Sequence, residues 1–387
     1  MTLIRTQVQK KKKEKNTPRA EIALSLTALL SLFLLLRMPD VAIAAMRDGL
    51  LLCARTVIPS LFPFMVISEL LVKSGASSYL GRLVYPLFRP IFGLGKESCA
   101  ALAMGTLSGF PVGAGTAATL YEEGKISKSE LTRLLCFCNN PSSAFVISAV
   151  GISLFGCRTL GILLYAVTLL SSATVGVVCR VLFKASKGSD PTNSNCNIPS
   201  TKKRQGAVIF TECIADSARS MLSVCAFVSF FSVLTGCLGA AVSGASLPDP
   251  LRALMIGFFE LTGGVSFAAS CQSVRYGMDV CAFLLGWSGL SVHFQIMSIC
   301  KGCDISFRPY FAAKAATAVL CVLYFRAALA LFQPKLVFAD SVFSEKTGAT
   351  PLSVFILFCF LISVLLFASR AIKSKRSKKR QKPRRIV

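Results

Sequence analysis

Long apolar runs separated by short polar stretches dominate this chain. Within each run the apolar residues are continuous, and they are not spaced at the intervals that form the core of a soluble domain. The pattern predicts an all-α polytopic membrane protein. Six runs are long enough to cross about 30 Å of hydrocarbon: residues 21–37, 56–73, 159–183, 220–240, 308–332 and 350–369.

Four further apolar regions are interrupted near their centres by glycine, proline or serine: residues 97–120, 129–156, 250–271 and 278–300. Irregular backbone at membrane depth is tolerated only where protein or a water-filled cavity shields it. We therefore expect the first and third regions to be re-entrant hairpins. The second and fourth are predicted to be broken crossings.

Three short segments recur in the same order in the two halves of the chain. Each pair falls in one series of parts: amphipathic helix, span, interrupted hairpin, broken span, span. We therefore predict a duplication into two repeats, residues 41–185 and 207–332. The aligned segments are 48–56 with 212–220, 106–109 with 260–263, and 139–143 with 287–291.

Basic residues indicate how the chain is oriented in the membrane. Of 43 lysines and arginines, seven lie in the tail 1–20 and ten in the tail 370–387. The positive-inside rule places both tails and the linker 186–206 in the cytoplasm. The first span, residues 21–37, is then a retained helix, and residues 350–369 form the last span. The two repeats enter from opposite sides, an inverted arrangement typical of secondary transporters.

The net charge of +25 also bears on partners. The basic tails flank apolar spans and suit a bilayer with anionic headgroups. They lack an aromatic-interleaved basic surface, so nucleic-acid binding is not expected.

The first hairpin carries the sequence Ser-Gly-Phe-Pro-Val-Gly over residues 108–113. Glycine permits a tight reversal and proline removes a backbone donor, so two short helices are expected to meet there. Such a turn leaves backbone amides and carbonyls free for a ligand. The alternative is a kinked helix that packs through small residues. The candidate binding residues are Ser108, Gly109, Pro111 and Gly113.

The first broken segment has the chemistry of a helix start. Asn140 is a candidate cap, and Pro141 suits the first helical position. The new helix N-terminus would attract an anionic group, although a purely structural break is the alternative. The candidate residues here are Asn139, Asn140, Pro141, Ser142 and Ser143.

In the second half, Glu260 places a carboxyl beside a glycine turn, deep in an apolar stretch. A carboxyl in the membrane is costly unless it is paired or protonated, which makes it a functional candidate. It could contact substrate, bind a coupling cation or carry a proton, and a satisfied structural glutamate is the alternative. Thr262, Gly263 and Gly264 are candidates with it.

The second broken segment offers Ser288 and His293, the one histidine of the chain. His293 is as well explained by packing as by ligand binding. Lys314 and Arg326 interrupt the span 308–332. Both can reach an interface by snorkelling, an interpretation that we favour for Arg326.

Most of the 16 cysteines lie in apolar runs and act as small packing residues. Cys300 and Cys303 have the spacing of a metal or redox pair but lack a second pair. The sequence therefore predicts no metal and no cofactor. It also lacks a nucleophile and base at recognisable spacing, so we do not expect an enzyme.

Three segments of the first half resemble the sporulation integral membrane protein YlbJ family. They are the run Gly-Thr-Leu-Ser-Gly-Phe-Pro-Val-Gly-Ala-Gly at 105–115, the polar stretch 122–135 and the Asn-Asn-Pro break at 139–141. Proteins of that family carry the nucleoside-recognition, or Gate, domain, which also occurs in concentrative nucleoside transporters and ferrous-iron permeases. The likeness covers about residues 40–335 and is most specific over 100–155.

The resemblance implies a transporter that moves a small aromatic acid, dipicolinic acid, towards the forespore. It also implies the mother-cell or outer forespore membrane, with both termini in the cytoplasm. A nucleoside or ion carrier of the same superfamily is the first alternative, and a non-transporting scaffold for spore-envelope assembly is the second. The sequence leaves open the coupling ion, the direction of transport and whether the chain forms a homo-oligomer.

Overall fold

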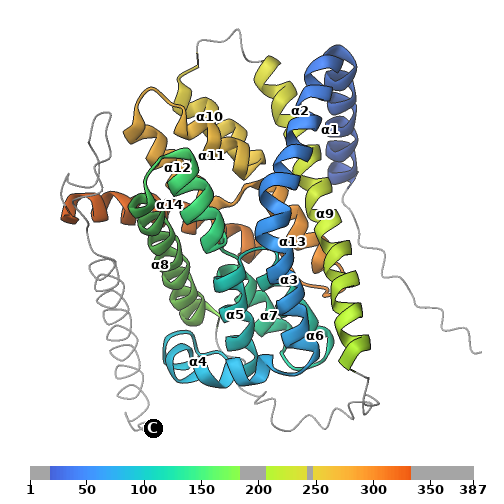
Figure 1. Ribbon diagram of the computed structural model, residues 1–387, viewed down its shortest axis with the longest axis vertical. Coiled ribbons are helices and arrows are strands. Elements are labelled where there is room, and N and C mark those ends of the chain that lie inside the picture. The colour runs from blue at the N-terminus through green and yellow to red at the C-terminus, as the bar shows by residue number, and fades with distance from the viewer. Residues whose placement is uncertain (1–17, 184–205, 242–246, 333–387) are drawn as a thin grey trace, which may run out of the picture.

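The computed structural model describes residues 18–183, 206–241 and 247–332, and these ranges contain helices but no strand (Figure 1). The predicted last span, 350–369, and the basic C-terminal tail lie outside the described residues. The predicted all-α membrane protein is confirmed. Four described helices are long and apolar enough to cross a membrane: Arg158–Leu182, Ala207–Ala241, Val274–Ile299 and Arg308–Leu331.

The N-terminal part differs from the prediction of one span at 21–37 and another at 56–73. An additional helix lies between them, and the second predicted span, which corresponds to α3 (Ile58–Lys73), is not among the candidate crossings of the described residues. Helix α1 (Pro18–Arg37) meets α2 (Pro39–Leu52) at a bend of 105°, and this pair counts as one further span if taken together. Helix α2 continues through a π-helical turn, η1 (Cys53–Val57), into α3. The π turn ends two residues before Pro59, which cannot donate to the carbonyl of Arg55, four residues earlier.

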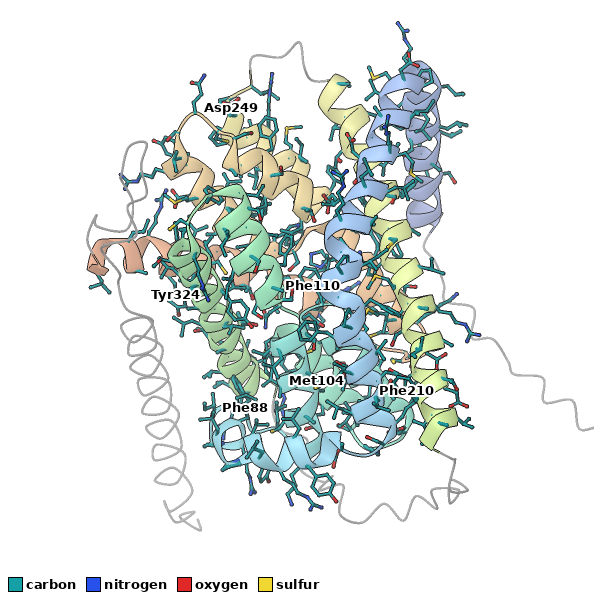
Figure 2. All side chains as sticks on the ribbon, viewed as in Figure 1. Phe88, Met104, Phe110, Phe210, Asp249 and Tyr324 are labelled. Atoms are coloured by element: carbon teal, nitrogen blue, oxygen red, sulfur yellow. The ribbon has the colours of Figure 1, made fainter. Side chains whose placement is uncertain are left out.

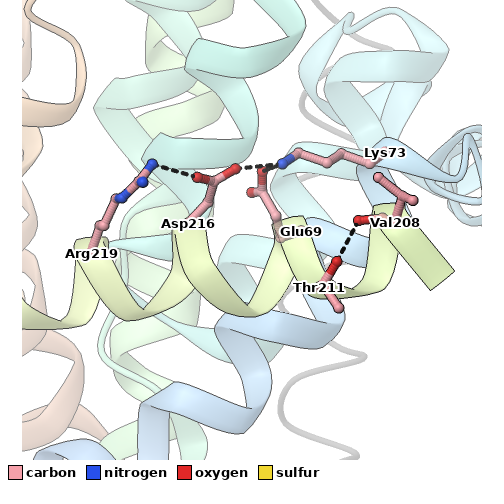
Figure 3. Close-up of polar contacts among 6 residues, drawn as sticks. All are labelled: Glu69, Lys73, Val208, Thr211, Asp216 and Arg219. Atoms are coloured by element: carbon pink, nitrogen blue, oxygen red, sulfur yellow. Dashed lines mark hydrogen bonds and ion pairs between the residues drawn. The ribbon is translucent and has the colours of Figure 1, made fainter. Parts of the chain in front are cut away.

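Helix α9 (Gly206–Ala241) is continuous over 36 residues and packs along α2 and α3 (Figure 1). The predicted span 220–240 is its second part. An ion pair of 2.6 Å joins Lys73 Nζ on α3 to Asp216 Oδ2 on α9. Glu69 and Arg219 extend this cluster at 3.2 and 3.3 Å (Figure 3). We call α2, η1, α3 and α9 the α3–α9 wall.

Both predicted hairpins are present as two helices that meet at a turn. The first consists of α5 (Lys96–Ser108) and α6 (Val112–Glu122), and the second of α10 (Asp249–Phe259) and α11 (Leu261–Ala269). Glycines let the helices of each hairpin approach closely. A Cβ on Gly264 would lie 2.1 Å from the Cα of Gly257. Such contact, more than the exclusion of water, stabilises helix pairs in lipid.

Both predicted broken segments are also interrupted. Helix α7 (Lys128–Cys138) is followed, after residues 139–143, by the π helix η2 (Ala144–Leu154). Helix α12 (Val274–Trp287) is followed, after Ser288, by α13 (Gly289–Ile299). The predicted spans 159–183 and 308–332 are confirmed as α8 (Arg158–Leu182) and α14 (Arg308–Phe332).

One helix has no counterpart in the predicted elements. Helix α4 (Ser77–Phe92) lies across the lower end of the molecule in Figure 1 and packs on α5. Its exposed face carries Tyr79, Leu83 and Leu87. Arginines and two internal prolines break up its apolar run, so its sequence lacks the pattern of a span.

Candidate functional site

The tip of the first hairpin lies directly on the first broken segment. Gly109 has φ 79°, and a Cβ there would lie 2.5 Å from the amide nitrogen of Ser142. The amide of Phe110 donates to the carbonyl of Asn140 at 2.8 Å. Phe110 lies near the centre of the molecule (Figure 2) and packs against both large apolar clusters of the core. The predicted residues 108–109 and 139–142 are therefore neighbours.

The first break does not have the capping chemistry that its sequence predicts. The side-chain amides of Asn139 and Asn140 donate to the carbonyls of Leu135 and Phe137, at 3.1 and 3.2 Å. They thus satisfy the end of α7, whose last carbonyls have no partner within the helix. The following helix starts only at Ala144, so the roles of Asn140 as its cap and of Pro141 as its first residue were wrong.

Capping at that helix start comes from a different residue. Ser142 Oγ accepts a hydrogen bond from the amide of Phe145 at 3.2 Å, while Ser143, directly before the helix, provides no side-chain cap. The side-chain amides of Asn139 and Asn140 bond back to α7, and Ser142 is the polar residue of this break that lines the central cavity described below.

Glu260 is the N-cap of α11. Its Oε1 accepts from the amide of Thr262 at 2.9 Å and its Oε2 from the amide of Gly263 at 2.6 Å. A carboxylate is favoured there because the first amides of a helix are unpaired and the helix dipole is positive at this end. The side chain is 3% exposed. Each oxygen retains acceptor capacity, so this structural task leaves room for a ligand.

The second break lies against the second hairpin tip. Gly289 has φ 78°, and a Cβ there would lie 2.9 Å from the amide nitrogen of Leu261. The indole of Trp287 donates to the carbonyl of Phe258 at 3.1 Å. In each half of the chain, therefore, the hairpin tip and the break meet at a glycine with positive φ.

Between these segments and the α3–α9 wall lies a small central cavity of about 50 Å³. Such a volume holds about one or two water molecules. Val57, Leu61, Val224 and Val228 close it on the side of the wall. The polar side chains that line it come from three of the four interrupted segments: Ser142, Glu260, Thr262, Ser291 and Gln295.

A much larger cavity of about 830 Å³ lies on the side of α10 and α11 and shares Phe145, Glu260 and Thr262 with the central one. This volume is in the range of small-molecule sites. Its charged lining residues are Asp48, Arg55 and Glu260. Its hydroxyl-bearing lining residues are Ser148, Ser153, Ser232, Thr235, Thr262 and Ser266.

A third cavity of about 230 Å³ lies on the opposite side of the central one, next to α6. Its acidic lining residues are Glu69, Glu122 and Asp216, and Pro111 of the first tip also lines it. The three cavities follow one another along the α3–α9 wall. On α9 the large cavity is lined by Ser232, Thr235 and Gly236, the central cavity by Val224 and Val228, and the third cavity by Asp216, Ser217 and Ser220.

The structure divides the predicted site residues into two groups. Ser142, Glu260, Thr262 and Gly263 line the large or the central cavity, and Pro111 lines the third. The other predicted residues pack behind the cavities or lie outside their linings: Ser108, Gly109, Gly113, Asn139, Asn140, Pro141, Ser143, Gly264, Ser288 and His293.

His293 illustrates the second group. Its Nδ1 lies 2.7 Å from the hydroxyl of Tyr310, and its ring packs edge-on against Trp287, Tyr310 and Phe311. It is 1% exposed and lines none of the three cavities. The packing interpretation of His293 fits this position.

Sequence reasoning missed several cavity residues, among them Arg55, Ser291 and Gln295. Arg55 lies in one of the repeated segments, aligned with Arg219, and that alignment was the available signal. Snorkelling was wrong for Lys314, which is 2% exposed and lies between the two breaks. Arg326 is exposed and pairs with Asp279 at 2.9 Å.

The large and central cavities also lack an evident metal site. Within the described ranges no group of three His, Cys, Asp or Glu side chains is arranged to hold an ion. Cys300 and Cys303 are both buried free thiols.

Comparisons with known proteins agree with the sequence resemblance. The profile of the Gate family, described as nucleoside recognition, matches residues 54–247. The sporulation integral membrane protein YlbJ of Bacillus subtilis (strain 168) is 31% identical over 314 residues, which cover 74% of this chain and 77% of that protein. No solved structure matches the chain significantly. The chain therefore belongs to the family of the sporulation integral membrane protein YlbJ and carries a Gate domain.

Proposed function

We propose that this protein is a carrier that moves a small polar solute across the membrane. The observation that carries the proposal is that Glu260, Ser142 and Ser291, from three interrupted segments, line one central cavity. Interrupted helices at membrane depth provide free backbone groups and helix ends for ligands. A helical protein that only scaffolds other components has no need of such segments around a cavity.

An inverted repeat is part of the proposal. The two halves have the same order of hairpin, broken segment and span, and their sequences align at three places. Each hairpin tip meets its own break at a glycine of positive φ. Two such units in opposite orientation would permit alternating access, with the valines and Leu61 of the α3–α9 wall as the barrier between the cavities.

The large cavity gives the solute its first contacts in this conformation, since the central cavity has space for little more than water. Dipicolinic acid, moved towards the forespore, is the solute that the family resemblance suggests. Arg55 is the one cationic side chain among the described lining residues and suits a carboxylate. A dianion would lie towards Arg55 and away from the carboxyl of Glu260.

The carboxyl of Glu260 favours a second candidate, a nucleoside. A ribose hydroxyl can donate to a carboxylate oxygen, and the two backbone hydrogen bonds do not use all the acceptor capacity of Glu260. The same large cavity would hold this solute, whose aromatic base could lie against Phe145. The two candidates thus differ in whether Arg55 or Glu260 makes the main polar contact.

Uptake by proteoliposomes tests the proposal. The full chain is reconstituted, and uptake of radiolabelled dipicolinate and radiolabelled uridine is compared with uptake by protein-free liposomes. Saturable uptake of dipicolinate that excess unlabelled dipicolinate abolishes and uridine does not is the expected result. Uptake of uridine alone would favour the nucleoside carrier. Protein that is folded but moves neither solute above the protein-free level would favour the scaffold.

A further inference from the structure

Lys314 lies where the two broken segments meet. Its Nζ donates to the backbone carbonyl of Asn139 at 2.6 Å and to the hydroxyl of Ser288 at 3.1 Å. Asn139 follows the last residue of α7, and Ser288 follows the last residue of α12. One ammonium group, carried by α14, therefore joins a break in the first half of the chain to a break in the second.

The position is electrically suited to a cation. The C-terminal end of a helix carries a partial negative charge of about half an elementary charge. The residue that follows α7 offers its backbone carbonyl to the ammonium and the residue that follows α12 offers its hydroxyl, so the ends of both helices lie beside one positive charge. The oxygens around it, a backbone carbonyl at a helix end and a hydroxyl, are of the kind that binds monovalent cations in interrupted helices.

Neither an acidic partner nor the solute accounts for this lysine. No carboxylate lies within ion-pair distance of Lys314 in the described part of the chain. Its side chain is 2% exposed and lines none of the three cavities. An unpaired charge is costly to bury, so the helix ends and oxygens must supply its stabilisation.

The first break also contains a buried polar atom without a partner. Asn139 is 1% exposed, and its Oδ1 has no hydrogen-bond donor among the described residues. Buried polar atoms are nearly always paired. The residue that supplies the carbonyl to Lys314 thus carries a second buried oxygen, which lies on the side of Gly113, where a Cβ would be 3.4 Å away.

We propose that the ammonium of Lys314 is a tethered cation that fills a monovalent-cation site between α7 and α12. It takes the place that a free ion would occupy and holds the two broken segments together. The wild-type protein accordingly needs no free monovalent cation at this position. Removing the ammonium while keeping the oxygens opens the site to a free cation or a small alkylammonium.

Thermal unfolding of the purified full chain tests this site without any transported solute. Lys314→Ala is compared with wild type in sodium, potassium, propylammonium and choline chloride at equal ionic strength. Propylammonium replaces the atoms that the substitution removes, and choline is too bulky for the space. The melting temperature of the variant is expected to fall by several degrees in choline and to recover with sodium or propylammonium, while wild type shows no ion-specific shift.

Two further variants keep the test decisive. Lys314→Met fills the space without a charge, so it is expected to be less stable than wild type in every salt; it also serves if Lys314→Ala does not accumulate. Lys301→Ala removes an exposed lysine and is the matched control, with no shift expected. A Lys314→Met protein as stable as wild type, or a Lys314→Ala protein without an ion-specific gain, would overturn the proposal. Neither result bears on whether the protein is a carrier.

Discussion

At the scale of the residue, Glu260 combines a structural contact with a place in the cavities. Its oxygens cap α11, and the same side chain lines the large and the central cavity. Substitution by alanine would therefore remove the cap and the charge together, and its effect could not be assigned. Variants that separate the two tasks exist, because serine and aspartate are both good N-caps.

We expect Glu260→Ser to fold with a melting temperature close to that of wild type, because the cap is kept. It is expected to lose most accumulation of solute, because the membrane-embedded carboxyl that could carry a coupling proton or bind a coupling cation is removed. Glu260→Gln is expected to lose about 1 kcal/mol of stability as well, since its amide nitrogen cannot accept the second backbone hydrogen. Uptake and thermal unfolding are measured on the same preparations. A Glu260→Ser protein with unchanged uptake would leave Glu260 with the capping role alone.

Arg55 is the residue that most directly tests the charge of the solute. It makes no ion pair among the described residues and lines the large cavity. We expect Arg55→Gln to raise KM for dipicolinate about tenfold, equivalent to about 1.4 kcal/mol. Its aligned counterpart Arg219, which pairs with Asp216 outside that cavity, is the matched control. Equal effects of Arg55→Gln and Arg219→Gln would exclude a specific contact.

At the scale of the element, the contact between hairpin tip and break depends on glycine. A Cβ on Gly109 would meet the backbone of Ser142, whereas a Cβ on Gly75, with nearly the same φ of 78°, would meet no atom within 4 Å. Comparing the two positions therefore separates the steric contact from the backbone preference. The glycine of the Ser-Gly-Phe-Pro sequence is therefore needed for the close approach of the tip to Ser142 as well as for its positive φ.

We expect Gly75→Ala to lower stability by about 1 kcal/mol, the cost of a left-handed residue with a side chain. Gly109→Ala is expected to lower it by at least about 3 kcal/mol, because displacement of the break adds an overpacking penalty. Thermal unfolding in detergent measures both. If the two variants lose the same stability, the tip does not depend on close contact with Ser142.

The interrupted elements were predictable from sequence because glycine and proline break helices locally. Each interruption lies at or close to a glycine, a proline or a serine of the sequence. The interruptions are the tips at 109–111 and 260 and the breaks at 139–143 and 288. The contacts made by Asn140 were not predictable, since a side-chain amide can satisfy either the helix before it or the helix after it. Only the fold shows that it binds back to Phe137.

Lys314 shows the same limit for charge. A lysine within an apolar helix can extend to an interface or bury its ammonium at a polar site, and the helix pattern is identical in both cases. The choice depends on the residues that follow α7 and α12. Asn139 and Ser288, which contact the ammonium, are 175 and 26 residues away from Lys314 in the sequence. Helix α9 is a similar case, because the sequence does not show that its amphipathic start and its apolar part form one continuous helix.

At the scale of the whole molecule, the order of the cavities gives the proposed inverted arrangement a physical consequence. The α3–α9 wall faces the large cavity at one end and the acidic third cavity at the other, with the apolar barrier between them. In a carrier, the two ends must open to opposite sides of the membrane. If the three apolar helices Ala207–Ala241, Val274–Ile299 and Arg308–Leu331 each cross once, the linker between α8 and α9 and the segment after α14 are expected on opposite sides.

Reporter fusions test this topology at positions outside the described residues. The basic linker contains Lys202, and the segment between the last two predicted spans contains Phe343. Because positively charged loops are retained in the cytoplasm, a reporter at Lys202 or after Val387 is expected to be cytoplasmic and one at Phe343 external. Fusions to paired reporters, one active only inside and one active only outside, serve as mutual controls. If Lys202 and Phe343 report the same side, three crossings do not separate them. The second half is then not inverted relative to the first. Alternating access of the large and the third cavity by movement of two inverted repeats would be excluded.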